Sequence, residues 1–67
     1  MSFSKKLLIA RAKLNLNQTQ LAEILGVSLI TINRWENEQS KPSKVAIIKF
    51  EDFCQEKGII FKELKND

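Results

Sequence analysis

The 67-residue chain contains no histidine and a single cysteine, Cys54. Histidine and cysteine are the usual zinc ligands, so we expect no metal site. A lone cysteine cannot form an internal disulfide, and small secreted domains usually carry several, which predicts a cytoplasmic protein. Without histidine, and with a core too small to enclose a pocket, the chain is poorly suited to catalysis. We therefore expect no enzymatic activity, no cofactor and a binding function.

The sequence also lacks any long hydrophobic run. No stretch approaches the roughly 18 apolar residues that a membrane span needs, and the N-terminus, MSFSKK, has no signal-peptide pattern. We expect no membrane contact, and nothing in the sequence indicates a small-molecule ligand. A chain this short buries only about 60% of its unfolded surface. The sequence therefore predicts one domain, residues 1–67, with one small core.

The charge is mildly basic and unevenly distributed. The net charge is +3, and the isoelectric point is about 9.3. Residues 1–50 contain eight basic and three acidic side chains, a net charge of +5, whereas residues 51–67 carry −2. This asymmetry is compatible with a basic face that binds a polyanion. Scattered lysines that only keep the protein soluble would give the same composition.

Apolar spacing and capping residues predict a series of helices. Phe3, Leu7, Ala10 and Leu14 recur at helical intervals, which predicts a first helix over about 3–14. Asn17 with Gln20 forms a capping-box pattern before a second helix, 18–25, that ends at Gly26. The remaining predicted elements are a helix at 29–36 capped by Ser28, a polar loop at 37–41, and a helix from Ser43 to about Lys57 that stops at Gly58. The segment Ile59–Phe61 is either extended or the start of a fifth helix.

Two short helices separated by Gly26-Val27-Ser28 have the spacing of a DNA-binding helix-turn-helix. The segments in register with this turn are NQTQLAE at 17–23, GVS at 26–28, INRWEN at 32–37 and KPS at 41–43. Together they resemble the phage-repressor and Cro type of helix-turn-helix protein, also called the xenobiotic-response-element family. The resemblance covers Leu7 to Phe53. It implies an all-α, compact, four- to five-helix lambda-repressor-like fold with a helix-turn-helix at about 18–36.

The same resemblance implies a sequence-specific transcriptional regulator that binds double-stranded DNA, and a repressor rather than an activator. Its second helix would lie in the major groove. An alternative from another class is a protein-binding adaptor or antitoxin-like partner with the same fold.

The resemblance places six residues on the base-reading face. Arg34 suits bidentate reading of guanine, and Asn33 suits adenine, although Arg34 could instead contact a phosphate or form a surface ion pair. Leu29 and Ile30 are aliphatic where the family often has polar residues, so they contact thymine methyl groups, dock a protein partner, or tuck against the core. The complete predicted face is Ser28, Leu29, Ile30, Thr31, Asn33 and Arg34.

A second group of residues is expected to hold the phosphate backbone. The start of the second helix presents N–H donors and a positive dipole end. For any single lysine, an idle solvated charge is the alternative. The predicted phosphate contacts are Gln18, Thr19, Ser40, Lys41 and Lys44, with Lys13 a weaker candidate. The resemblance further implies a structural ion pair between Arg11 and Glu36.

The last predicted helix is apolar on more than one side. Cys54 shares an arc with Phe50 and Phe53, which favours a small buried side chain over a reactive thiol. Val45 and Ile48 lie on the opposite arc. Together with the apolar residues Ile59–Phe61, which open the C-terminal tail 59–67, they indicate either a homodimer or a tail that folds back on its own core.

Overall fold

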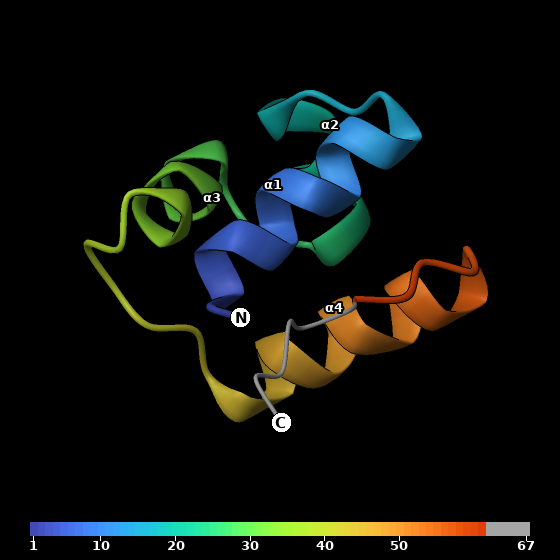
Figure 1. The fold of residues 1–67 in the computed structure, drawn as a ribbon. Helices are drawn as coiled ribbons and strands as arrows, with labels where there is room; N and C mark the ends of the chain where they lie inside the picture. The colour runs from blue at the N-terminus through green and yellow to red at the C-terminus, as the bar shows by residue number, and fades with distance from the viewer. Residues whose placement is uncertain (62–67) are drawn as a thin grey trace.

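The computed structural model describes residues 1–61, which form four helices and no strand (Figure 1). Helix α1 spans Phe3–Leu14 and α2 spans Gln18–Leu25. Helix α3 spans Leu29–Glu36, and α4 spans Lys44–Glu56 with Lys57 as its C-cap. This arrangement confirms the predicted all-α, four-helix fold with a central helix-turn-helix, and the helix bounds agree with the sequence pattern.

Each helix begins at a serine or asparagine whose side chain accepts a backbone N–H bond from the first turn. At α2 the capping box is complete, because Asn17 Oδ1 accepts from Gln20 N at 2.7 Å while Gln20 Oε1 accepts from Asn17 N at 2.9 Å. Such caps satisfy donors that have no partner within the helix. The four N-caps are Ser2, Asn17, Ser28 and Ser43.

Each helix is followed by a residue in the left-handed region. Gly26, with φ 69°, allows its own N–H to bond Glu23 O at 3.3 Å and the N–H of Val27 to bond Ala22 O at 3.0 Å. This paired pattern reverses the chain sharply, so α3 begins three residues after Gly26. The left-handed residues are Asn15, Gly26, Glu38 and Gly58. Glu38, with φ 57°, pays the full steric cost of its Cβ atom in this conformation, because it lacks the short polar side chain that makes the region more accessible to asparagine.

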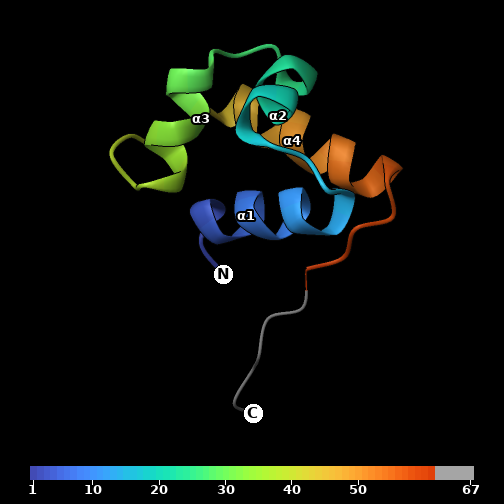
Figure 2. The ribbon, with the colours of Figure 1, turned by 90° about the horizontal axis from the view of Figure 1, so that it is seen from above.

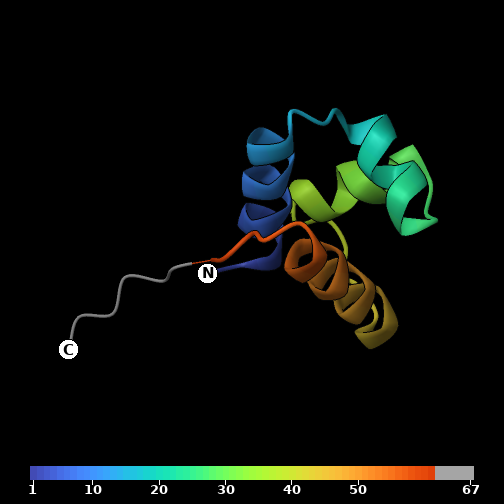
Figure 3. The same cartoon turned by 90° about the vertical axis from the view of Figure 1, so that its right-hand side faces the viewer.

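The core lies where the four helices meet. Figure 2 shows α1 along one side of the molecule, with α2, α3 and α4 on the other, and Figure 3 shows α4 below α2 and α3. Phe3 makes edge-to-face contacts with Trp35, at a centroid distance of 5.5 Å, and with Phe50, at 5.3 Å. Such contacts stabilise the fold beyond the burial of apolar surface. Through Phe3, α1 therefore packs against both the end of α3 and α4. The largest fully buried side chains are Leu7, Leu21, Ile32 and Phe50.

The segment after α4 resolves the choice left open for Ile59–Phe61, because these residues are not helical. They turn back from α4 toward α1 (Figure 3). Ile59 is buried in the core, Ile60 is exposed, and Phe61 stacks near Phe50 with Lys6 Nζ 5.6 Å from its ring centroid. This part of the tail therefore folds on its own core. The rest of the predicted dimerising tail, 62–67, lies outside the described residues.

Candidate nucleic-acid interface

Helix α3 has one buried face and one outward face. Ile32 and Trp35 point into the core, whereas Ile30, Asn33 and Arg34 are exposed on the opposite side. The N-cap Ser28 and Leu29 are also exposed, and Thr31 is half-buried. The α2–α3 junction therefore brings the six residues predicted to read bases onto one short helix and its cap.

The first turn of this helix has its hydroxyl groups paired with one another. Ser28 Oγ accepts from Thr31 N at 3.1 Å and lies 2.9 Å from Thr31 Oγ1. Both hydroxyls therefore help to hold the helix start. Leu29 and Ile30 are 47% and 63% exposed, so neither tucks against the core.

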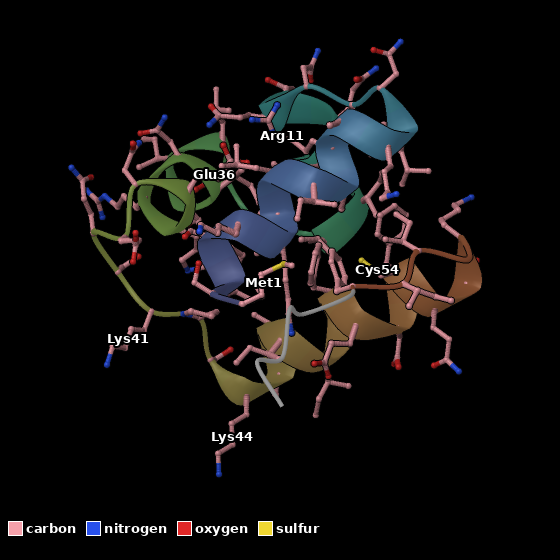
Figure 4. All side chains as sticks on the ribbon, in the orientation of Figure 1. Met1, Arg11, Glu36, Lys41, Lys44 and Cys54 are labelled. Atoms are coloured by element: carbon pink, nitrogen blue, oxygen red, sulfur yellow. The ribbon has the colours of Figure 1, made fainter. Side chains whose placement is uncertain are left out.

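The ion pair between Arg11 and Glu36 joins α1 to the end of α3 (Figure 4). Arg11 Nε donates to Glu36 Oε2 at 2.7 Å, and Arg11 Nη2 donates to Glu36 Oε1 at 2.8 Å. The Glu36 side chain is only 5% exposed, against 21% for Arg11. The hydrogen bond from Glu36 raises the pKa of Arg11 above its ordinary value, more than burial lowers it. The pair fixes α3 against α1 through two charge-assisted bonds.

Gln18 extends this pair into a chain of hydrogen bonds across the exposed face. Its Nε2 donates to Glu36 Oε1 at 2.9 Å, and its Oε1 accepts from Asn33 Nδ2 at 3.5 Å. Asn37 Nδ2 in turn donates to Asn33 Oδ1 at 3.3 Å and to Asn33 O at 2.9 Å. An amide has two donor hydrogens and two acceptor lone pairs, so one of each on Asn33 stays outside these bonds. Sequence reasoning missed this role of Gln18, although the Gln18-to-Asn33 spacing across the turn is a usable signal.

The predicted phosphate contacts lie on three segments. Gln18 and Thr19 open α2, in which the first backbone hydrogen bond of the helix runs from Leu21 N to Asn17 O. Ser40 and Lys41 follow the end of α3, beside a hollow of about 170 Å³ that Trp35 also lines. In Figure 4, Lys41 and Lys44 project outward from the loop and from the first turn of α4.

Lys13 lies in the last turn of α1. Lys13 and Lys44 thus lie outside the α2–α3 pair, and their part in phosphate binding stays a prediction.

Cys54 lies away from this face. It is 2% exposed, and burial, followed by the charge of Glu51, raises the pKa of its thiol to about 11. A hollow of about 400 Å³ beside it is lined mainly by α4 and the segment Gly58–Phe61. No group of three or more potential ligands in residues 1–61 is arranged to hold a metal ion. Within the same residues no helix is long and apolar enough to cross a membrane.

Comparison with protein families places the central part of the chain in a known family. A family model described as helix-turn-helix matches residues 7–59. The matched region contains α2, α3 and α4 in full and α1 from Leu7 onward. No curated protein and no solved structure matches the chain.

Proposed function

The chain belongs to the helix-turn-helix family of the Cro/C1 type, whose members are DNA-binding transcription regulators, and from this premise we propose that it is a repressor that occupies a specific operator. The observation that supports this proposal is the outward face of α3. Ile30, Asn33 and Arg34 are exposed there, while the opposite face is anchored by Ile32, Trp35 and the buried carboxylate of Glu36. A rigid helix with an exposed polar and aliphatic face suits the major groove.

Base reading is assigned to Ser28, Thr31 and the exposed residues of α3. Arg34 has the fork geometry to donate two bonds to guanine O6 and N7. Asn33 is held by Gln18 on one side and Asn37 on the other, which leaves one donor and one acceptor for an adenine. Groups held before binding lose less conformational entropy on binding.

Phosphate binding is assigned to the start of α2 and to the basic loop. The first N–H groups of a helix have no intrahelical acceptor and favour an anion. The side chain of Gln18 is committed to Glu36 and Asn33, so at this end the backbone and Thr19 would make the contact. Ser40, Lys41 and Lys44 would supply the remaining phosphate contacts, with Lys13 as a weaker contributor.

The operator complex is proposed to contain two copies of the chain. Val45 and Ile48 are 64% and 55% exposed on α4, and apolar side chains at this exposure favour a self-complementary contact. A two-fold dimer would bind half-sites about one DNA turn apart. We further propose that the chain acts in the cytoplasm as one domain and has no catalytic activity.

The test is duplex binding as a function of salt, with two variants. The logarithm of the binding constant is expected to fall with slope about −0.9 for each phosphate neutralised. Arg34→Ala is expected to cost about 1–3 kcal/mol on the preferred duplex and to weaken base preference, whereas Lys41→Ala is expected to weaken all duplexes alike. Lys57→Ala, at the far end of α4, is the matched control. Salt-independent binding would refute the proposed function, and interchanged effects of the two variants would refute the assigned roles.

A further inference from the structure

We propose that Leu29 and Ile30 are specificity-determining residues that read the C5-methyl groups of thymines in the major groove. This inference rests on the proposed function and adds to it the chemistry of part of the operator. It starts from the exposure of two large aliphatic side chains, 47% for Leu29 and 63% for Ile30. They are neighbours in the first turn of α3.

The position of these side chains on α3 places them among groups that contact DNA. At 100° per residue, Leu29 lies on the same row as Asn33, and Ile30 on the same row as Arg34. Each aliphatic side chain is thus one helical turn before a side chain that can hydrogen-bond to a base. An aliphatic face that docks a protein would continue along its row with further apolar residues. Here both rows change to hydrogen-bonding groups within one turn, which favours DNA.

The chemistry of the first turn points to the methyl group in particular. Ser28 and Thr31 have their hydroxyls paired at 2.9 Å, and Ser28 also accepts from Thr31 N. These bonds occupy part of the hydrogen-bonding capacity of the first turn, whereas the exposed side chains of Leu29 and Ile30 offer only apolar contact. In the major groove the apolar feature of a base pair is the C5-methyl of thymine, which apolar side chains contact.

The test removes the methyl group and leaves the hydrogen-bonding edge of the base unchanged. A duplex selected from a random pool is resynthesised with each thymine replaced in turn by uracil. Loss of one buried methyl is expected to weaken binding about fourfold. In a second arm, the same base pair is exchanged for cytosine–guanine with and without a C5-methyl on the cytosine. The methylated form should bind about fourfold more tightly if the methyl itself is read.

Variants connect the effect to the two residues. Leu29→Ala and Ile30→Ala are exposed substitutions to a better helix former, so α3 should remain folded. For each variant, the ratio of the binding constants for the thymine and uracil duplexes is expected to fall to about one at one position of the operator. Ile60→Ala, an exposed aliphatic residue after α4, should leave the ratio near four. A ratio near one at every thymine in the wild-type protein, or a ratio that survives both variants, would overturn the inference. Salt-dependent binding of the selected duplex would in that case still support the proposed DNA binding. Selection of no duplex at all would overturn both.

Discussion

Replacing Arg11 with methionine tests the ion pair that holds α3 against α1. The change keeps the apolar stem but removes both bonds to Glu36, at 2.7 and 2.8 Å. It leaves a carboxylate that is 5% exposed with only the 2.9 Å bond from Gln18. Breaking a buried pair costs about 3–5 kcal/mol. Because the Arg11 side chain is 21% exposed, we expect the low end, about 3 kcal/mol.

This loss is large for a chain of 67 residues. Total stability of about 0.05–0.15 kcal/mol per residue is usual, so a loss of 3 kcal/mol removes a third or more of it. The expected fall in Tm is about 12–24 °C. Thermal and urea unfolding followed by the fluorescence of Trp35, the single tryptophan, measure this directly. Lys13→Met, an exposed basic position on the same helix, is the matched control and should change stability by less than about 0.5 kcal/mol.

A double-mutant cycle separates the pair from its surroundings. Glu36→Met alone should also destabilise, but the combined variant removes both charges and should lose less than the sum of the single changes. We expect a coupling free energy of about 2 kcal/mol or more. A coupling below about 0.5 kcal/mol would refute the conclusion that this pair fixes α3 against α1.

Two further predictions concern the free energy of unfolding. Glu38→Gly should raise it by about 0.5–1 kcal/mol, because glycine adopts φ 57° without steric cost; a lower urea midpoint would contradict this, and Gln39→Gly, without positive φ, is the control. The pKa of Cys54, raised to about 11 from 9.0, means that the folded state keeps a proton which the unfolded state loses between these values. Stability should therefore fall as pH rises from about 9 to 11, and more steeply than in Cys54→Ala; equal slopes would contradict the buried thiol.

Much of the fold follows from local signals in the sequence. The helix starts are marked by the capping residues Asn17, Ser28 and Ser43, with Gln20 completing the capping box. Two helix ends are marked by the glycines with positive φ, Gly26 and Gly58. Both signals depend only on neighbouring residues. Ile59–Phe61 could not be assigned from sequence. The position of Phe61 depends on contacts with Phe50 and Lys6, which belong to α4 and α1 and follow from no local sequence pattern.

The sequence predicted which residues of the candidate site face outward, but not the hydrogen bonds between their side chains. Helical periodicity with the family resemblance placed Asn33 and Arg34 on the outward face of α3 and Ile32 on the buried one. The hydrogen bonds that Gln18 donates to Glu36 and accepts from Asn33 were not predicted. They depend on the angle between α2 and α3, because Gln18 faces α3 only when Gly26 reverses the chain. The exposure of Leu29 and Ile30 likewise follows from this packing.

Selection of bound sequences from a pool of random duplex DNA tests the central claim most directly. A sequence-specific regulator with α3 in the major groove should enrich a short motif that contains a guanine read by Arg34. Two inverted copies about one DNA turn apart are expected if the chain binds as a dimer. Arg34→Ala should lose preference at that guanine while keeping salt-dependent binding. A pool that remains random after repeated rounds would contradict sequence-specific DNA recognition by this chain.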